Sequence, residues 1–594
     1  MERIRGKDFI NPRFEKKFNN DIIAKFILQL KRFNKINKLY SENFDKNGPK
    51  FIDSVIDSLG IQFEVDETDL KRIPENGAFI TVSNQPFGGI DGLLLLKILS
   101  DKRPDFKLLA NFLLHTIEPL NDFSIPLTEN DETKPNKFSF TTLKRTLQHV
   151  QEGNALGIFP AAEISKVHSL NNISDRKWQN SLIKLIKLAQ VPVVPIYFQG
   201  NNSWIFHLLG NVYPALQTAR LSKEFFNKKK KTIKIRINKP ISVKELNEFH
   251  DIERLSRFLR AKTYALGTPF EVKKFIRPKF IPKAKKIEKI IDPIPLEKIQ
   301  SEINLLKENH HLFDSNEYSV VCGPSVEIPN ILNEIGRLRE ITFREVGEGT
   351  NRSLDIDEFD LYFYQLIIWD NENKKIAGAY RVGKGNEIME KYGVNGFYIN
   401  TLFNLKAGFY PVLEESLELG RSFIIKEYQR KPFSLFLLWK GILYFLLKNT
   451  EYRYLIGPAS ISNDFSKFSQ SLIIDFFKEN FFNHELSKYI QPRKRFKIKQ
   501  NPNFDNDVFI QNTKQDVKKL DKFIQDIEPD YNTPVLFKKY IQLNAKLLGF
   551  NVDPKFNNCV DGLMILDIFD VPLNTLKALS KELEDDTILE RFNF

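Results

Sequence analysis

Cysteine is scarce in this sequence: Cys322 and Cys559 are the only two in 594 residues. Two cysteines cannot build a disulfide framework, so the chain is expected in a reducing compartment. Long apolar runs are missing as well, because the strongest, residues 435–447, is interrupted by Lys440 and Gly441 and is shorter than the roughly 20 residues of a membrane-spanning helix. No apolar stretch follows the first five residues, so no signal peptide is expected. These absences predict a cytoplasmic protein without a membrane span.

Nucleic-acid and metal signatures are also lacking. The sequence has no zinc-ligand spacing, no RNA-binding aromatic motif and no helix-turn-helix pattern, so neither nucleic acid nor a bound metal is expected. Positive charge is present instead: 88 Lys and Arg against 75 Asp and Glu give a formal net charge of +13. A basic protein suits acidic partners, and with nucleic acid unsupported these are an anionic membrane or an acidic carrier protein.

Residues 14–39 bear on the membrane prediction. Phe, Ile and Leu recur there at helical spacing, with lysines between them, which predicts a basic amphipathic helix. Such a helix either lies on a membrane surface, which would make the protein peripheral, or packs on its own domain with a solvated basic face. The pattern favours neither alternative over the other.

The length of the chain predicts two large domains. Short apolar strands, at 78–82, 156–159, 191–198 and 232–237, alternate with helical segments from residue 78 to 241, which predicts an α/β domain over residues 1–275. Residues 276–295 contain several prolines and a cluster of lysines and are expected to form a linker. In residues 296–594, two helices precede strands at 360–369, 375–382 and 413–424, a helix at 434–448 and a strand at 454–456. This order predicts an α+β domain and resembles the acetyltransferase-type (GNAT) fold, an antiparallel sheet splayed around an acyl-donor slot.

The most informative stretch of the first half is Val-Ser-Asn-Gln-Pro-Phe-Gly-Gly-Ile-Asp-Gly at residues 82–92. Three further blocks follow in order, at 111–126, 157–165 and 191–196. Together they resemble the lysophospholipid (glycerolipid) acyltransferase family, in its hemolysin-like branch. The resemblance implies a glycerolipid-acyltransferase α/β domain whose third block contacts the substrate, through Phe159, Pro160, Glu163 and Ser165.

In that family a His takes the proton of the acceptor hydroxyl and an Asp orients the His. This chain keeps Asp91 but has Gln85 at the His position, and a carboxamide cannot accept that proton. Losing a general base typically costs about 10²–10⁴ in rate. The domain is then either catalytically weak and used for docking, or served by another base such as Asp91 or His115, or supplied with a base by its substrate. Asp91 is also explained as an N-cap of the helix expected over residues 93–99.

A second set of charged residues runs through the other half of the chain. Its motifs are Asp-Ile-Asp-Glu-Phe-Asp at 355–360, Ala-Tyr-Arg at 379–381 and Glu-Leu-Gly-Arg-Ser at 418–422, after Arg339 and Phe343. They resemble the ornithine/glycine N-acyltransferase family of aminolipid synthesis, which is related to the acyl-homoserine lactone synthases. The match continues through residues 455–461 and 534–554 and covers essentially the whole second domain.

The resemblance implies roles for these residues. N-acylation needs a neutral amine, and Glu418 is assigned as the carboxylate that takes the amine proton. Arg381 and Arg421 either hold a substrate carboxylate or brace the acidic loop, since a guanidinium matches a carboxylate with two parallel hydrogen bonds. Asp357 and Asp360 are expected to order that loop by pairing with Arg339. The substrate-binding set is completed by Phe343 and Ser422. The alternative for each charge is a salt-bridge network on the surface.

The acyl donor is predicted from a missing feature. Acetyl-CoA enzymes of this fold place a Gly-rich turn before the central helix, and residues 426–433 contain no glycine. Arg430 and Lys431 offer point charges there, which suits the phosphopantetheine arm of an acidic carrier. Acyl-ACP is therefore the expected donor, with acyl-CoA as the alternative and no bound cofactor.

The two resemblances together predict a bifunctional aminolipid synthase. The second domain would attach a 3-hydroxyacyl chain to the amine of ornithine or glycine, and the first resembles the enzyme that acylates the 3-hydroxyl. Two alternatives stay open. The chain is an N-acyltransferase whose first domain only binds lipid or carrier, or it is a non-enzymatic hemolysin-like membrane-binding protein.

Overall fold

The computed structural model describes residues 40–110, 117–127, 140–161, 166–169, 172–175, 177–200, 202, 232–267, 287–346, 348–429, 431–498 and 505–592. The chain forms two compact units, and the predicted class, α/β followed by α+β, is confirmed. Unit 1 consists of Met1–Ile276, Gln500–Asn512 and Gln525–Pro529, and unit 2 of Arg277–Lys499, Thr513–Ile524 and Asp530–Phe594. Several predictions fall outside the described residues: those for the helix at 14–39, His115, Glu163, Ser165 and Arg430.

Unit 1 is built on a seven-stranded sheet with the order β1-β9-β8-β2-β5-β3-β4. Every pairing is parallel except that of β8 with β9. The strands are β1 (Gln62–Val65), β2 (Phe79–Ser83), β3 (Lys107–Ala110), β4 (Ser124–Pro126), β5 (Ala155–Ile158), β8 (Val193–Phe198) and β9 (Thr232–Ile237). A two-stranded sheet joins β6 (Lys166–Ser169) and β7 (Asn172–Ser174). The alternation of strands and helices predicted from the sequence thus forms a mostly parallel sheet.

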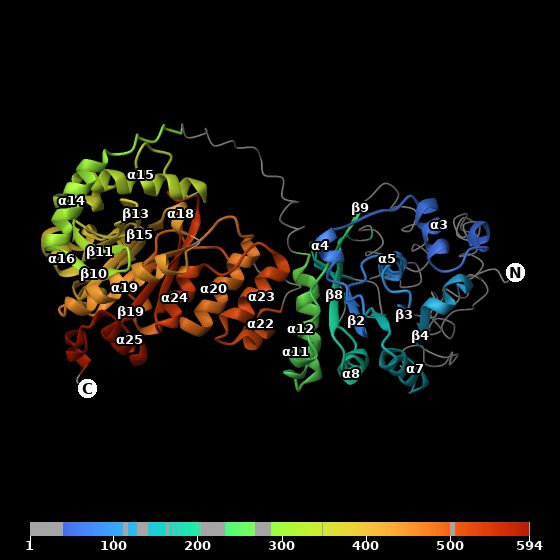
Figure 1. Ribbon diagram of the computed structural model, residues 1–594. Coiled ribbons are helices and arrows are strands. Elements are labelled where there is room, and N and C mark those ends of the chain that lie inside the picture. The colour runs from blue at the N-terminus through green and yellow to red at the C-terminus, as the bar shows by residue number, and fades with distance from the viewer. Residues whose placement is uncertain are drawn as a thin grey trace. The chain divides into compact units, whose positions relative to one another are not determined.

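Helices cover both faces of this sheet (Figure 1). They are α3 (Pro49–Leu59), α4 (Glu67–Leu70), α5 (Ile90–Ser100), η2 (Glu118–Phe123), α7 (Phe140–Gln151), α8 (Asn180–Ala189), α11 (Val243–Asn247) and α12 (Ile252–Ala265). Phe79 packs with α3 and α5, while its neighbour Ile80 packs with α8 and α12. Strand β2 is buried along its whole length for this reason, as expected of a parallel strand between two helical layers.

A late part of the chain completes unit 1, which the sequence did not predict. Helix α22 (Asn506–Thr513) contributes Val508 to the apolar cluster around α8 and α12. Arg257 forms an ion pair with Asp505. Lys262 donates to Asp526 Oδ2 at 2.5 Å, and each of these two side chains is 4% exposed. A pair so fully desolvated is costly to break, so Asp526 is held firmly on α12.

Unit 2 is built on an eight-stranded sheet with the order β10-β11-β12-β13-β15-β16-β19-β18. The strands are β10 (His311–Ser315), β11 (Tyr318–Pro324), β12 (Tyr364–Asp370), β13 (Lys375–Lys384), β15 (Ser416–Ile424), β16 (Tyr454–Ile461), β18 (Lys546–Asp553) and β19 (Cys559–Asp567). A small sheet joins β14 (Phe403–Leu405) and β17 (Ile490–Pro492). Within the eight-stranded sheet only β15 and β16 pair in parallel.

The helices of unit 2 lie on both faces of its sheet (Figure 1). They are α14 (Leu296–Asn309), α15 (Pro329–Glu345), α16 (Gly385–Tyr392), α17 (Tyr410–Glu414), α18 (Lys426–Gln429), α19 (Pro432–Lys448), α20 (Lys467–Phe481), α21 (His484–Ser487), α23 (Val517–Ile527), α24 (Val535–Gln542) and α25 (Leu573–Leu583). Short 3₁₀ helices are η3 (Ser325–Glu327), η4 (Glu358–Leu361), η5 (Gly393–Gly396), η6 (Tyr398–Thr401), η7 (Ala407–Phe409), η8 (Ile568–Asp570) and η9 (Asp586–Phe592).

We call the face of this sheet that carries Gln365, Arg381 and Glu418 the loop face. It is covered by α14 and α15 at one end and by the 3₁₀ segments after β13 at the other. Helix α19 packs on the opposite face, where a side chain at Gly441 would meet Val320 and Leu366. The helix is buried along most of its length, which explains why apolar residues surround it on all sides.

The parallel pair β15–β16 is short, and its register runs only from Ser416–Tyr454 to Glu418–Ile456. The strands part beyond this point, as the predicted splayed sheet requires. Gly457 lies at the point of separation, and a Cβ there would collide with the carbonyl oxygen of Leu419. The glycine in the predicted motif at 455–461 is therefore required by a close backbone approach.

Two expected strand bounds need correction. Asp360 does not begin a strand but closes the turn η4, because its side chain accepts the N–H of Asp357 while Asp357 accepts that of Phe359. Residues 410–414 form helix α17, with Pro411 in its first turn, so β15 starts at Ser416. Residues 287–295 of the predicted linker run along unit 2, where Glu288 N–H donates to the carbonyl of Asn351 at 3.0 Å. Among the described residues no helix has the length and apolarity to cross a membrane.

Candidate active site

A row of polar residues crosses the loop face of unit 2. Cross-strand partners share a face of a sheet, and alternate residues along a strand do too. Gln365 pairs with Arg381, and Arg381 pairs with Gly420 on β15. Beyond the separation of β15 and β16, Ser460 pairs with Asp561, which pairs with Asn551. The row is completed by Glu418, two residues before Gly420. Polar groups thus lie on both sides of the strand separation.

Arg339 anchors one end of this row from helix α15. Its Nη1 donates to Asp360 Oδ1 at 2.8 Å and its Nη2 to Gln365 Oε1 at 2.9 Å. Neither Arg339 nor Asp360 has an exposed side chain. Burial alone would raise the pKa of Asp360, but the guanidinium groups of Arg339 and Arg381 outweigh it and hold the pKa well below its usual range. Asp360 is therefore ionised, and the predicted pairing of Arg339 with the acidic loop is made by this residue.

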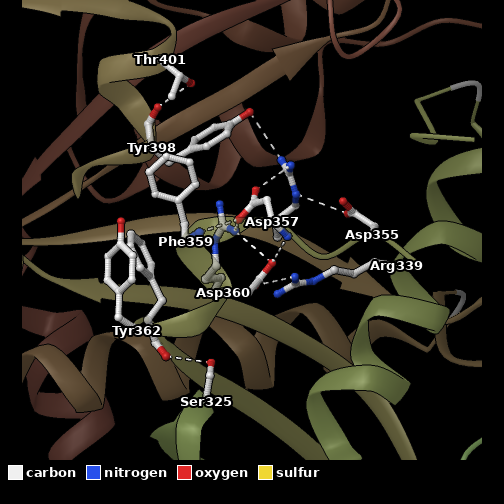
Figure 2. A network of polar contacts seen from close by, with 12 residues as sticks. Ser325, Arg339, Asp355, Asp357, Phe359, Asp360, Tyr362, Tyr398 and Thr401 are labelled. Atoms are coloured by element: carbon white, nitrogen blue, oxygen red, sulfur yellow. Dashed lines mark hydrogen bonds and ion pairs between the residues drawn. The ribbon is translucent and has the colours of Figure 1, made fainter. Parts of the chain in front are cut away.

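Asp357 pairs with two other arginines rather than with Arg339. Arg381 Nη1 donates to its Oδ1 at 2.5 Å, and Arg421 Nη2 donates to its Oδ2 at 3.1 Å. Asp355 joins the cluster through an ion pair of 3.3 Å with Arg421 Nε. Figure 2 shows these carboxylates, together with that of Asp360, turned toward one group of nitrogen atoms. The arginines therefore brace the acidic loop, which is one of the two roles expected for them.

Arg421 reaches this cluster because of a bulge in β15. The register with β13 shifts between Ala379 and Arg381, and Arg421 has a φ of +55°. A left-handed conformation is costly for a residue with a Cβ and is characteristic of functional sites. In regular alternation with Gly420, Arg421 would point away from the loop face. The bulge turns its side chain onto that face instead.

Tyr398 stands beside both arginines. The guanidinium carbons of Arg381 and Arg421 lie 5.3 Å and 5.1 Å from the centre of its ring. Arg421 Nη1 donates to its hydroxyl at 3.4 Å, and that hydroxyl donates to Asp553 Oδ2 at 3.5 Å. Burial raises the pKa of Tyr398, so the hydroxyl stays protonated at neutral pH. Tyr398 thus links the arginine cluster to a carboxylate on β18.

Arg381 has two unused donors among the described residues, whereas Arg339 and Arg421 each leave only Nε without a hydrogen bond. The side chain of Arg381 is 1% exposed, and its Nε and Nη2 have no hydrogen-bond partner among the described residues. A buried guanidinium with two unsatisfied N–H groups costs free energy unless an acceptor arrives. The oxygens of a substrate carboxylate or of a carbonyl under attack are acceptors of the right kind. This is the other role expected for Arg381.

Glu418 is placed differently from a base open to substrate. Its Oε1 accepts the N–H of Ile399 at 2.7 Å and its Oε2 the N–H of Tyr398 at 3.1 Å, and the residue is 1% exposed. Burial raises the pKa of Glu418 to about 7, although both hydrogen bonds and the charge of Arg381 oppose the rise. Because both oxygens cap the turn η6, this geometry makes Glu418 a residue that positions Tyr398. Each oxygen accepts one backbone hydrogen bond, so the carboxylate is held against η6, and the role of Glu418 as proton acceptor stays a prediction.

Asp561, Ser460 and Asp553 were not predicted. Ser460 Oγ donates to Asp561 Oδ1 at 2.7 Å, and Asp561 is 4% exposed. Burial raises the pKa of Asp561 to about 7, and the nearby charges of Asp553 and Glu348 add to the rise. A signal existed in the sequence: Asp561 is the one charge inside β19, whose other charge, Asp567, ends the strand, and Ser460 lies inside the matched motif at 455–461.

Three residues predicted for this site lie elsewhere. Phe343 packs, partly buried, in the apolar cluster of α14, α15 and the sheet. Ser422 hydrogen-bonds Tyr380, whose hydroxyl also meets that of Tyr540, because the bulge places Ser422 on the opposite face. Lys431 is exposed, and its ammonium lies 4.5 Å from the ring centre of Tyr428. Lys431 remains available to a carrier, whereas Phe343 and Ser422 have structural contacts.

Unit 1 places its motif at the ends of parallel strands. Asn84 fixes the end of β2 to β8, since its Nδ2 donates to the carbonyl of Phe198 at 3.0 Å and its Oδ1 accepts the N–H of Phe198 at 2.7 Å. The backbone N–H of Gln85 donates to Asp175 Oδ1 at 3.3 Å. A carboxylate thus lies beside the position where the family has its His. Asp175 also accepts from Trp178 Nε1 at 3.4 Å and is 2% exposed.

Asp91 is the second residue of α5 rather than its N-cap, which is Gly89. Its Oδ2 accepts the N–H groups of Phe87 and Gly88 at 3.0 Å and 2.7 Å, so it holds the loop that carries Gln85. Phe159 is 7% exposed and packs in the core, and the carbonyl of Pro160 accepts the N–H of Gln179. These contacts keep the loop in shape, and the described residues bring no imidazole to it.

The chemistry available differs between the units. Unit 2 offers buried carboxylates with pKa values near 7, arginine donors without acceptors and a point at which β15 and β16 cease to pair. Unit 1 offers a well-formed loop that carries Gln85 at the position where the resemblance expects a His. Among the described residues no group of three or more His, Cys, Asp or Glu side chains is arranged to hold a metal ion.

Comparison with known proteins adds to this geometry. A family described as "Acyltransferase" matches residues 21–272, and one described as "Acetyltransferase (GNAT) domain" matches residues 338–440. The glycine N(alpha)-acyltransferase of Phocaeicola vulgatus is 30% identical over 277 residues, which cover 44% of this chain and 83% of that protein.

Two relatives carry a different name. The lyso-glycine lipid O-acyltransferase of Bacteroides thetaiotaomicron is 28% identical over 232 residues, which cover 38% of this chain and 82% of that protein. Its counterpart from Phocaeicola vulgatus is 25% identical over 251 residues, which cover 41% of this chain and 87% of that protein. Two proteins that are separate in Phocaeicola vulgatus therefore both have a counterpart in this one chain.

Proposed function

The chain is an acyltransferase that belongs to the family of the Phocaeicola vulgatus glycine N-acyltransferase, and from this premise we propose that unit 2 joins a 3-hydroxyacyl chain to the amine of glycine. The observation that carries the proposal is the 30% identity over 83% of that relative. The buried cluster of Arg339, Arg381 and Arg421 with its acidic loop supports it, since these are the residues of the family motif. Ornithine is the alternative amine.

Amide formation from a thioester sets three requirements. The amine must lose a proton, the carbonyl carbon must be held near it, and the oxygen that becomes negative must be stabilised. The unused donors of Arg381 suit a negative oxygen, and the separation of β15 from β16 suits an extended acyl-thioester arm. The buried carboxylates of the loop face suit the proton.

The donor is proposed to be an acyl carrier protein. The net charge of +13 and the exposed Lys431 support an acidic partner with a phosphopantetheine arm. The lyso-lipid formed by N-acylation is amphiphilic, so we also propose that the protein works at the anionic inner face of the membrane.

Unit 1 is proposed to bind that lyso-lipid and to O-acylate it slowly. The support is the likeness to the two lyso-glycine lipid O-acyltransferases and the intact backbone of the motif loop. Because Gln85 replaces the His, the rate of O-acylation is expected to be about 10²–10⁴ lower than that of an enzyme that has its general base. The non-enzymatic alternative is set aside by the relatives, all of which are acyltransferases.

The test is a reaction with the purified full chain. It is incubated with a 3-hydroxyacyl-ACP or the matching CoA thioester and with glycine or ornithine, and the products are identified by mass spectrometry. N-(3-hydroxyacyl)glycine from the ACP thioester is the expected product. Arg421→Lys is expected to lower its rate at least about 100-fold, while Arg453→Lys, at a partly exposed ion pair of the same unit, serves as the control. No amide from either amine would refute the proposal.

A further inference from the structure

Asp561 and Ser460 form a pair beyond the point where β15 and β16 separate. They face each other across β16 and β19, on the loop face, and the 2.7 Å hydrogen bond fixes the carboxylate. Asp553, on the neighbouring strand β18, lies within the same electrostatic environment and is 2% exposed. Unlike Glu418, Asp561 has no backbone amide bound to its carboxylate among the described contacts.

Among the described residues Asp561 forms no ion pair. Its hydrogen bonds come from Ser460 and Cys559, and the charges of Asp553 and Glu348, which raise its pKa, are negative. A buried carboxylate without a counter-ion is unfavourable, and a cationic ligand would relieve the cost. An ammonium group is such a ligand, and the proposed substrate carries one.

A second, independent observation points to a ligand at the same face. Arg381 is fully buried and keeps Nε and Nη2 without acceptors in the described structure. Tyr398 contacts Arg381 and Asp553: its ring lies beside the guanidinium, and its hydroxyl donates to Asp553 Oδ2. Unsatisfied donors on one side of Tyr398 and unbalanced carboxylates on the other complement the two ends of an amino-acid zwitterion.

We propose that Asp561 is the catalytic residue that takes the proton of the substrate ammonium, and that Ser460 orients it. This inference rests on the proposed N-acylation. It replaces Glu418 as the base, since each oxygen of Glu418 already accepts a backbone N–H of η6. Asp553 adds negative charge that attracts the ammonium, and Arg381 receives the carboxylate of the amino acid.

N-acylation removes two protons from the substrate nitrogen. The ammonium nitrogen gives one proton to Asp561 and becomes a neutral amine. Its lone pair forms the C–N bond at the thioester carbonyl carbon, the C–S bond breaks, and the sulfur leaves with that electron pair. The second proton lost by nitrogen goes to the leaving sulfur, and Asp561 releases its proton to solvent. The products are the amide and the free thiol of the carrier, and no oxidant or reductant is needed.

The titration of Asp561 agrees with this role. Its pKa near 7, raised by burial, makes the carboxylate a proton acceptor matched to neutral pH. For the wild-type chain, kcat/KM with glycine should therefore rise with pH through an apparent pKa near 7. Asp561→Asn should abolish that rise.

The decisive experiment compares two acceptors in the purified full chain. Glycine is an ammonium at pH 7, whereas aminooxyacetate carries the same carboxylate on a weakly basic amine that is already neutral. Asp561→Asn is expected to lower turnover of glycine at least about 100-fold but that of aminooxyacetate less than about 10-fold. Asp567→Asn, at the end of the same strand, where it pairs with Arg453, is the control.

The outcomes separate the possible failures. An equal loss with both acceptors, or no loss with either, would overturn the role of Asp561. So would a loss selective for glycine in Glu418→Gln but not in Asp561→Asn. A wild-type chain that acylates no amine refutes the proposed function itself. Ser460→Ala is expected to lower kcat with glycine while the KM for the thioester stays the same.

Discussion

Glu418 Oε1 accepts the backbone N–H of Ile399 at 2.7 Å, and this bond ties strand β15 to the turn η6. The other carboxylate oxygen takes the N–H of Tyr398, so one side chain satisfies two amides at the start of the turn. The ring of Tyr398 contacts both arginines of the acidic loop. Glu418 therefore sets the position of Tyr398, and through it the geometry of the arginine cluster.

Removing that carboxylate should loosen η6. Glu418→Ala leaves two buried amides without acceptors, at a cost of about 1–3 kcal/mol each. Hydrogen–deuterium exchange should then speed up at Tyr398 and Ile399 while it stays unchanged in β18. Glu415→Ala, at an exposed position just before β15, is the matched control. Unaltered exchange at η6 would show that other contacts hold the turn.

The stability of unit 2 should depend on pH because of Glu418 and Asp561. Burial raises both folded-state pKa values to about 7, whereas in the unfolded chain both groups titrate at roughly 4. Between pH 4 and pH 7 the folded state binds more protons than the unfolded chain does. The free energy of unfolding therefore falls as pH rises and levels off above pH 7. The upper limit of the loss is on the order of 4 kcal/mol for each group.

This dependence is measured by urea unfolding of the full chain between pH 4 and 8. Hydrogen exchange of the amides in β13 and β19 reports the unfolding of unit 2. Glu418→Gln and Asp561→Asn should each flatten the decline, whatever they do to the stability at pH 4. Asp567→Asn, whose carboxyl is paired with Arg453, should leave the slope intact. A wild-type stability that rises from pH 4 to 7 would contradict both burial-raised pKa values.

The ion pair of Arg339 with Asp360 should dominate the stability of the acidic loop. Arg339→Met leaves the carboxylate of Asp360 buried without its strongest partner, and breaking such a pair costs about 3–5 kcal/mol. The unfolding of unit 2 in urea measures this loss. Lys375→Met is the control, because Lys375 and Glu427 are about half exposed or more and such a pair contributes about 0–1 kcal/mol. Equal losses in the two variants would contradict the prediction.

Restoring an imidazole at Gln85 should accelerate O-acylation in unit 1. The backbone N–H of Gln85 donates to Asp175 Oδ1, and Asp91, on α5, accepts a backbone N–H from the loop that carries Gln85. Gln85→His should therefore raise the rate of transfer to a lyso-lipid hydroxyl about 10-fold or more, while the rate of N-acylation stays constant. The rates are measured with purified N-(3-hydroxyacyl)glycine and an acyl thioester. A variant no faster than wild type would show that more than the base is missing from unit 1.

The sequence predicted the elements of both units better than their long-range contacts. Strand β9 was placed at its observed bounds, because its apolar alternation and its flanking polar residues are local signals. The return of residues 500–512 to unit 1 was not predicted, since the partners of Val508 lie more than 200 residues away. Local composition carries no signal of such a pairing.

In the candidate site, too, residues within a sequence motif were predicted, and residues brought in by long-range contacts were not. Arg339, Asp360, Arg381 and Arg421 were found through their motif, and they do meet. Ser422 was misplaced because a bulge reverses the alternation of β15, and a bulge leaves no mark in a single sequence. Asp561 was missed because it belongs to no recognised motif, and only the register of β16 with β19 brings it to Ser460.

The most direct test of the account is the lipid content of a bacterium that makes no aminolipids and expresses this chain. Mass spectrometry of its total lipids should detect N-(3-hydroxyacyl)glycine, with the di-acylated lipid at a much lower level because Gln85 replaces the base of unit 1. The Asp561→Asn chain, expressed equally well, should produce neither lipid. A wild-type strain that contains the folded protein but no acylated amino acid would contradict the account.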